Sequence, residues 1–219
     1  SCLSQCSLTV ALPILSAFGI ETCILPSAIL STHTAFKGFA CMDFTEEFKK
    51  IIAHWEKEKI NFNVFYTGYL LNKEQINIVK EIFNKFNANN NNSLKIIDPV
   101  MGDNGELYTG FDLNFVQAMK SLCLNADIIL PNLTEACLLT GYEYKEKYDE
   151  EYISNLIKKL EEFKVKIIII TGIGYEENTT GIIVVENGKT KYYKHRKIST
   201  ISYGSGDVFS SIFIGSYLK

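Results

Sequence analysis

Apolar residues recur every three or four positions in several stretches of the chain, which is the pattern of an amphipathic helix. Leu8, Leu12 and Leu15 form one such series, and Gly19 follows where a C-terminal cap would lie. We therefore predict a helix over about residues 7–18, kinked or tightened at Pro13. The same reasoning predicts helices over residues 45–55, 74–86, 113–122, 134–139, 151–163 and 207–218.

Short apolar runs lie between these helices and end at glycine, proline or polar residues, as buried strands do. They predict strands at residues 21–25, 28–30, 63–67, 94–97, 126–130 and 166–170. Two further strands, at residues 181–185 and 190–193, should form a hairpin around Asn187-Gly188. We expect a surface loop at the asparagine-rich residues 87–92 and a long irregular loop over residues 99–110.

The alternation of strand and helix predicts a doubly wound α/β fold. The isoleucine run at residues 166–170 is bounded closely by helices, which is typical of a central parallel strand covered on both faces. A chain of 219 residues with 47% hydrophobic content can bury the core of one domain of this size. No internal repeat or linker divides the sequence.

Charge and composition argue against two classes of partner. The formal net charge of −3 is small and mixed in sign, unlike the basic surface that nucleic-acid binding requires. No apolar run approaches the roughly 20 residues that cross a bilayer, and no basic segment precedes an apolar one at the start. We therefore expect a soluble, cytoplasmic protein that binds neither nucleic acid nor membrane.

The cysteine pattern favours reduced thiols. The six cysteines contain no Cys-x-x-Cys pair, and only three histidines could complete a metal site with them. We expect Cys23, Cys123 and Cys137 to be buried as small hydrophobic residues. A reactive role stays open for Cys2 and Cys6.

Candidate chemical groups gather at the carboxyl ends of the predicted strands, the edge at which open parallel sheets bind ligands. The four clusters are Asp98 with Asp103, Asn132 with Glu135, Thr171 with Gly172, and the turn Gly204-Ser205-Gly206 with Asp207. Because the clusters share this edge, we expect them to surround one ligand.

The turn at residues 204–207 has the clearest chemistry. Its glycines let backbone amides point into one space, and the following helix adds the positive end of its dipole, so an anion hole is predicted. Asp207 could then accept a proton from a substrate hydroxyl while the amides hold a transferring phosphate. The alternative is that Asp207 is only an N-terminal helix residue favoured by the dipole.

The upstream clusters are also open to two interpretations. Asp98 and Asp103 flank a turn and could hold Mg²⁺ through water and orient phosphates. An Asx turn would explain Asp103 without any ligand. Asn132 and Glu135 are three residues apart and can face one side of a beginning helix, although helix capping would also explain Asn132.

In this order the motifs resemble those of pyridoxal kinases within the ribokinase-like superfamily. The matching stretches are D-P-V-M-G-D-N-G at residues 98–105, then Leu107-Tyr108, P-N-x-x-E at 131–135, Thr171-Gly172 and G-S-G-D at 204–207. The early segment is similar too, at residues 6–13, at S-T-H-T (31–34) and at T-G-Y (67–69). The resemblance spans almost the whole chain and implies a three-layer α/β/α sandwich with a mostly parallel central sheet.

The resemblance also implies an activity: ATP-dependent phosphorylation of the 5′-hydroxymethyl group of pyridoxal, pyridoxine or pyridoxamine. Asp207 would be the catalytic base, with anion-hole amides from Gly204, Ser205 and Gly206. The residues implied to bind the nucleotide are Asp98, Asp103, Asn132, Glu135, Thr171 and Gly172, of which Asp98 and Glu135 would organise Mg²⁺. A K⁺ requirement is open.

The same resemblance implies a vitamer pocket lined by Ser1, His33, Thr34 and Tyr69, where an aromatic face suits a pyridine ring. A core role is the alternative for His33 and Tyr69. It further implies a homodimer, with residues 28–39 as a plausible contact.

The sequence departs from the family pattern in several places. S-C-L-S-Q at residues 1–5 replaces a glycine-rich S-G-F-G-R, and G-S-G-D replaces the commoner G-T-G-D. The chain also begins where a first strand should already have ended, and it stops one helix after Asp207. We therefore expect residues 1–219 to form a single kinase domain that lacks the first strand and the C-terminal helices.

Two alternative functions stay open. A hydroxymethylpyrimidine (phosphate) kinase of thiamin synthesis has the same fold, but that family usually has cysteine where Asp207 stands and a different sequence after D-P-V-M. A non-catalytic paralogue that binds nucleotide or vitamer would fit the missing ends, but it would not explain the intact acids and glycines.

Overall fold

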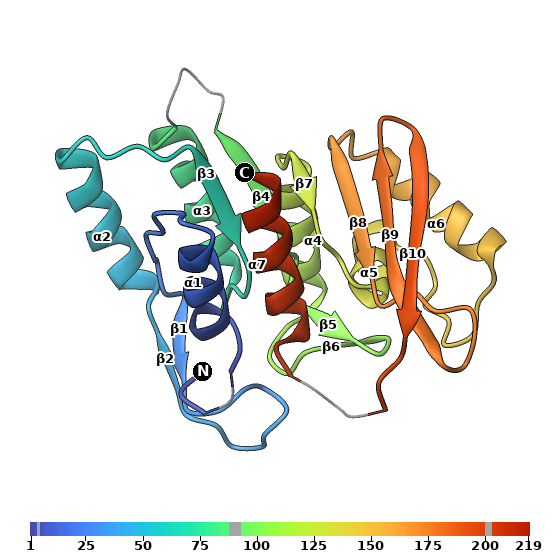
Figure 1. Ribbon diagram of the computed structural model, residues 1–219. Helices are drawn as coiled ribbons and strands as arrows, with labels where there is room; N and C mark the ends of the chain where they lie inside the picture. The colour runs from blue at the N-terminus through green and yellow to red at the C-terminus, as the bar shows by residue number, and fades with distance from the viewer. Residues whose placement is uncertain (4, 88–92, 200–202) are drawn as a thin grey trace.

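A six-stranded sheet forms the centre of the computed structural model, which describes residues 1–3, 5–87, 93–199 and 203–219 (Figure 1). Its strand order is β10-β9-β8-β7-β4-β3. The strands are β3 (Val64–Thr67), β4 (Leu94–Ile97), β7 (Ile128–Ile129), β8 (Ile167–Thr171), β9 (Thr179–Glu186) and β10 (Lys189–Arg196). From β3 to β8 neighbouring strands are parallel, whereas β9 and β10 are antiparallel additions at one side. The predicted mostly parallel sheet is confirmed.

Helices cover both faces of this sheet (Figure 1). The helices are α1 (Leu8–Ala17), α2 (Thr45–Lys57), α3 (Lys73–Lys85), α4 (Leu113–Cys123), α5 (Leu133–Thr140), α6 (Glu150–Glu161) and α7 (Ser205–Tyr217). Side chains of α2 to α6 pack in one large cluster, and those of α1 and α7 pack in a smaller one on the other face. The chain thus has the predicted three-layer α/β/α arrangement.

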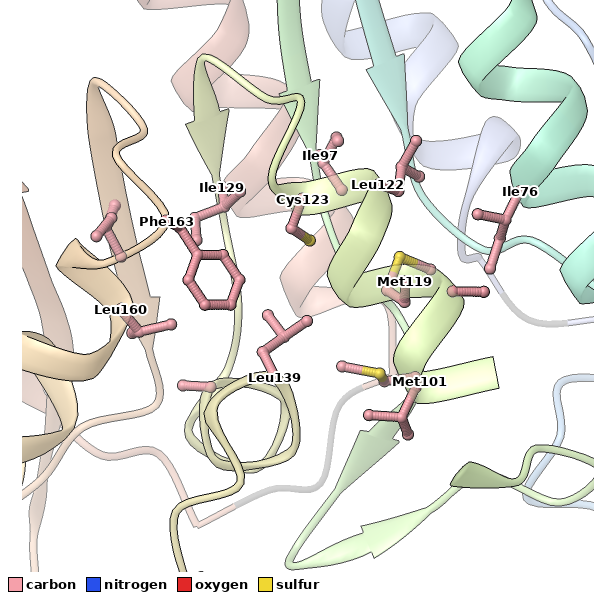
Figure 2. Close-up of a cluster of buried hydrophobic side chains, with 14 of the residues drawn as sticks. Ile76, Ile97, Met101, Met119, Leu122, Cys123, Ile129, Leu139, Leu160 and Phe163 are labelled. Carbon is pink, nitrogen blue, oxygen red and sulfur yellow. The ribbon is translucent and has the colours of Figure 1, made fainter. Parts of the chain in front are cut away.

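Alternation along the strands explains how one sheet supplies two cores. On β4, Ile97 belongs to the large cluster, while its neighbour Ile96 belongs to the smaller one. Figure 2 shows Ile97 and Ile129 packed beneath helical residues such as Leu122 and Leu139. Full burial of an isoleucine side chain contributes about 1.5–3 kcal/mol, so an apolar run buried on both faces is a strong fold determinant.

Two small antiparallel sheets lie outside the central one. One pairs β1 (Ala28–Leu30) with β2 (Cys41–Asp43), and the other pairs β5 (Gly102–Asp103) with β6 (Glu106–Leu107). The second lies in a segment predicted to be irregular. Its turn residues Asn104 and Gly105 have φ of 51° and 82°, the left-handed backbone that an Asn-Gly hairpin turn uses.

Two predictions near the chain start are wrong. Residues 21–25 form no strand, because they pair with no neighbouring strand among the described residues and Ile24 is 42% exposed. Cys23 is exposed rather than buried, whereas Cys123 and Cys137 are buried as predicted. The apolar run alone therefore predicted a strand at residues 21–25, although the described residues provide no strand that pairs with it.

The remaining element predictions hold to within a few residues. The hairpin of β9 and β10 turns at Asn187 and Gly188, with φ of 51° and 70°. Pro13 lies inside α1. Of the predicted loop at residues 87–92, only Asn87 lies within the described residues, where it forms a bridge to Phe62. No helix in the described part of the chain is long and apolar enough to span a bilayer.

Candidate active site

Adjacent carboxyl ends of the parallel strands bring three of the predicted clusters together. Asp98 follows β4, and its amide donates to the Thr67 carbonyl at the end of β3 (2.9 Å). Asn132 follows β7 and forms a parallel bridge with Thr171, the last residue of β8. These residues therefore lie along one edge of the sheet, as the strand order requires.

A buried hydrogen bond connects this edge to α7. The Ser210 hydroxyl donates to Oδ2 of Asp98 at 3.0 Å, and both residues are buried. Burial and then the charge of Asp207 raise the pKa of Asp98 to about 7, and the Ser210 hydroxyl partly opposes this rise. Asp98 and Asp207 are thus close enough to repel each other, although they are far apart in the sequence.

Glu135 is a second buried acid in the same place. It caps α5 reciprocally with Asn132: the Glu135 amide donates to Asn132 Oδ1 and the Asn132 amide donates to Glu135 Oε2, each at 2.9 Å. The Met101 amide donates to Glu135 Oε1 at 3.2 Å. Burial and then the charge of Asp98 raise the pKa of Glu135, while the two amides oppose the rise. The capping interpretation of Asn132 is therefore correct, and it places Glu135 beside Asp98.

Asp207 lies at the start of α7 and is half-buried. Its Oδ2 accepts a hydrogen bond from the Ser7 amide at 2.9 Å, which joins the beginnings of α1 and α7. Burial raises the pKa of Asp207, and the Ser7 amide partly opposes that rise. None of the ion pairs among the described residues includes Asp98, Glu135 or Asp207.

The glycine turn leaves an open helix end. Gly204 precedes α7 with φ of 80°, and no side chain of the described residues caps it. The Val208 amide is the first to bond within the helix, to the Gly204 carbonyl, so the amides of Ser205, Gly206 and Asp207 have no helical acceptor. Among the described residues outside its own helical turn, a Cβ on Gly206 would meet no atom within 4 Å, so the space beside this glycine is open in that part of the chain.

Asp103 lies on the exposed hairpin of β5 and β6. Its carboxylate accepts hydrogen bonds from the Asn104 amide at 2.9 Å and from Asn104 Nδ2 at 3.2 Å. The Asx-turn interpretation therefore accounts for these contacts of Asp103. The hairpin tip is held by a bond from the Gly105 amide to Thr134 Oγ1 at 2.9 Å. This bond anchors the hairpin to α5 beside Glu135.

One phenol shows that all four acids converge. Burial raises the pKa of Tyr108 above its ordinary value, and the charges of Glu135, Asp103, Asp98 and Asp207 raise it further. Coulomb interactions weaken with distance, so all four acids lie near this phenol. The acids that follow β4 and that lie on the β5–β6 hairpin, α5 and α7 are therefore gathered around Tyr108.

The four residues predicted to line the vitamer pocket are less closely gathered. The His33 ring lies 4.0 Å from that of Tyr203, the residue before Gly204, which places His33 beside the glycine turn. Ser1 Oγ lies 3.1 Å from Cys6 Sγ, next to Ser7.

Tyr69 contacts Phe111 at 5.7 Å between ring centroids, and burial raises the pKa of Tyr69 to about 12. Thr34 is half-buried in the same loop as His33.

An apolar cavity of about 280 Å³ lies elsewhere, between α7 and the β8–β9 part of the sheet. Its lining includes Ile169, Phe209 and Phe213 and none of the predicted site residues. The acid cluster, rather than this cavity, is the candidate active site.

Comparisons with known proteins show the family of this chain. The family model described as "Phosphomethylpyrimidine kinase" matches residues 22–219. The "Pyridoxal kinase" of Dictyostelium discoideum is 30% identical over 219 residues, covering 92% of this chain and 70% of that protein. The chain belongs to the pyridoxal kinases of the ribokinase-like superfamily.

Two crystal structures extend the comparison. A Bacteroides thetaiotaomicron protein, described as a phosphomethylpyrimidine kinase and crystallised with pyridoxal, is 38% identical. Its TM-score is 0.90, over 98% of this chain and 76% of that one. Plasmodium falciparum PdxK with AMP-PNP and PL is 26% identical, with a TM-score of 0.80 over 100% of this chain and 78% of that one. The pyridoxal kinase fold predicted from the motifs is confirmed.

The sequence motifs missed several residues of this pyridoxal kinase site. Ser210 is three residues after Asp207, so helical spacing alone could have placed both on one face of α7. Tyr66 alternates with the buried Phe65 on β3, and the charges of Asp98 and Asp207 both raise its pKa after burial. No sequence pattern indicated that Tyr108 would lie near the acids or that the Ser7 amide would donate to Asp207.

Asp98→Asn is expected to stabilise the ligand-free kinase at pH 8 and to change its stability much less at pH 4. The pKa of Asp98 rises from 3.8 to about 7 on folding. Since the folded state binds this proton more tightly, the free energy of unfolding falls as the pH rises from about 4 to 7. Asparagine loses no proton, so the melting temperature at pH 8 should rise by about 5 °C. Thermal unfolding at both pH values measures this, and a lower melting temperature at pH 8 would contradict it.

Proposed function

We propose that this pyridoxal kinase transfers the γ-phosphate of ATP to the 5′-hydroxymethyl group of pyridoxal or a related B6 vitamer. The observation that supports this most strongly is the gathering of Asp98, Glu135, Asp103 and Asp207 around Tyr108. The uncapped end of α7 opens beside them. Acids for metal and proton chemistry, placed next to free amides for phosphate, are the parts that phosphoryl transfer requires.

Asp207 is the base in this proposal. Its carboxylate accepts the hydroxyl proton as the hydroxymethyl oxygen attacks the γ-phosphorus, the bond to the β,γ-bridging oxygen breaks, and ADP leaves. Because burial raises the pKa of Asp207, its carboxylate is a stronger base than an ordinary aspartate. The Ser7 amide holds the carboxylate in place at 2.9 Å.

The amides at the start of α7 act on the phosphoryl group. The amides of Ser205, Gly206 and Asp207 would donate to its oxygens as their negative charge grows, and the helix dipole adds to this stabilisation. Thr171 and Gly172 lie at the end of β8 and would contact the nucleotide. Positioning and charge stabilisation then supply most of the rate.

The residues fit a Mg²⁺ ion held mainly by phosphates and water. Asp98 and Glu135 are buried acids whose ionisation is opposed by burial and by a neighbouring acid, which is Asp207 for Asp98 and Asp98 for Glu135. A cation would offset this cost. Among the described residues, no group of three acids, cysteines or histidines forms a complete metal site. Mg²⁺ typically binds through one or two carboxylates plus substrate phosphates, where it neutralises phosphate charge. Cytoplasmic location and a homodimer through residues 28–39 remain predictions.

A substrate comparison tests the proposed function. The purified protein is incubated with ATP and Mg²⁺ and with either pyridoxal or hydroxymethylpyrimidine, and the ADP formed is followed for both substrates. We expect kcat/KM for pyridoxal to exceed that for hydroxymethylpyrimidine by about tenfold or more, because the site has the acid Asp207 where the thiamin-pathway enzymes usually have cysteine.

The opposite preference would support the thiamin-pathway alternative. Binding of pyridoxal and AMP-PNP by a folded protein that makes no product would support the non-catalytic paralogue. Either result contradicts the proposal.

A further inference from the structure

Two adjacent serines of α7 are buried at the same depth but have different partners. Ser211 Oγ donates to the Asp207 carbonyl at 2.6 Å, four residues earlier in its own helix. This is the usual local bond of a helical serine. Ser210 Oγ instead donates to Asp98 Oδ2 at 3.0 Å, across 112 residues of sequence. The two serines are 2% and 0% exposed, so solvent competes with neither bond.

The Asp98 carboxylate depends on this contact. Among the described residues, the Ser210 hydroxyl is the one donor to the Asp98 side chain. A carboxylate without that donor can take other staggered rotamers and lose its orientation. A hydrogen bond to a charged group contributes about 1.5–3 kcal/mol, which is enough to favour one orientation strongly.

The position of Ser210 on α7 links the Asp98 carboxylate to the helix that carries Asp207. Ser210 is three residues after Asp207, so both side chains project from one face of the helix. The hydroxyl therefore fixes Asp98 relative to the helix that carries the base and the open amides. Tyr66 of β3 also interacts with the Ser210 side chain, so the hydroxyl is confined between helix and sheet.

We propose that Ser210 is a positioning residue that holds the Asp98 carboxylate in the orientation that phosphoryl transfer requires. The hydroxyl ties the acid that follows β4 to the helix that begins with the base. This inference rests on the proposed function and deepens it. The alternative is that the buried Ser210 hydroxyl has a purely structural role. Ser211 provides the control, because replacing it with alanine also removes one hydroxyl group that is equally buried in α7.

Three variants separate the two roles: Ser210→Ala, Ser210→Thr and Ser211→Ala. We expect Ser210→Ala to lower kcat about tenfold, with KM for pyridoxal within about twofold of the parent value, because the lost bond orients an acid rather than binding the vitamer. Ser210→Thr keeps a hydroxyl and should restore most of kcat. Ser211→Ala should leave kcat within about twofold. Thermal unfolding of all variants shows whether each is folded.

A binding measurement keeps this inference separate from the proposed function. If the parent protein does not phosphorylate pyridoxal, the proposed function is wrong, and Ser210 is then judged by titration calorimetry with AMP-PNP and Mg²⁺. We expect binding by Ser210→Ala to be about fivefold or more weaker than by Ser211→Ala. Equal kcat and equal AMP-PNP affinity in the two alanine variants would overturn the positioning role, as would a folded Ser210→Thr variant no more active than Ser210→Ala.

Discussion

Asp207→Asn should lower kcat for pyridoxal phosphorylation by about 10²–10⁴-fold, the range that removal of a general base typically costs. The amide cannot accept the hydroxyl proton. Its oxygen can still accept the Ser7 amide bond, now 2.9 Å long, so the joint between α1 and α7 is kept. KM for ATP should stay within about threefold, because the amides at the start of α7 are unchanged. Steady-state kinetics with both substrates measures the effect.

Stability distinguishes this loss from misfolding. Since burial raises the pKa of Asp207 in the folded state, the ionised carboxylate costs stability above its ordinary pKa of 3.8. Asp207→Asn should therefore melt at or above the temperature of the parent protein at pH 8. Asp149→Asn is the matched control, since Asp149 is an exposed acid that caps α6 and asparagine caps equally well. A stable Asp207→Asn variant with parental kcat would exclude Asp207 as the base.

The acid cluster lowers the stability of the folded chain when its carboxylates are ionised, and a bound cation would reduce this cost. Asp98, Glu135 and Asp207 all have a raised pKa, and burial is the largest cause for each. A chain under selection for stability alone would replace such groups with apolar residues. A site for phosphates and a cation requires such acids in one place, because the bound charges change the free-energy cost of ionising them.

The central fold could be predicted because its strands are apolar runs buried on both faces. The isoleucines of β8 and the Asn187-Gly188 turn each indicate one structure by local chemistry. Residues 21–25 were wrongly predicted because an apolar run contains no information about whether a partner strand lies beside it. The β5–β6 hairpin was missed although Asn104-Gly105 is a hairpin-turn pair, since strands of two residues have no detectable alternation.

The candidate site was predictable to the extent that topology determines it. Asp98, Asn132 and Thr171 follow parallel strands, so the edge rule places them together. The bond between Ser210 and Asp98 could not be predicted, because it depends on the rotation of α7 against the sheet. Contacts of this kind are set by packing of the whole domain and leave no local pattern.

Gly204→Ala should unfold at a temperature about 5–15 °C lower than the parent protein. Gly204 has φ of 80°, a conformation that costs alanine about 1–2 kcal/mol. Its added Cβ would also overlap the Gln5 carbonyl oxygen, so the backbone before α1 would have to move. Together these effects should cost about 2–4 kcal/mol, with 2–4 °C per kcal/mol for a domain of this size. The shift would disturb the Ser7 to Asp207 bond, so kcat should fall about 100-fold or more.

Gly206→Ala is the matched variant, and it separates backbone strain from phosphate access. Gly206 lies in the first turn of α7, and a Cβ there would meet no atom of the described residues within 4 Å outside that turn. Alanine favours a helix by up to about 1 kcal/mol, so the melting temperature should stay unchanged or rise. The methyl group would stand in the open space before the amides, so KM for ATP should rise about tenfold or more. Parental kinetics in Gly206→Ala would show that no phosphate approaches this turn, and a parental melting temperature in Gly204→Ala would contradict the contact with Gln5.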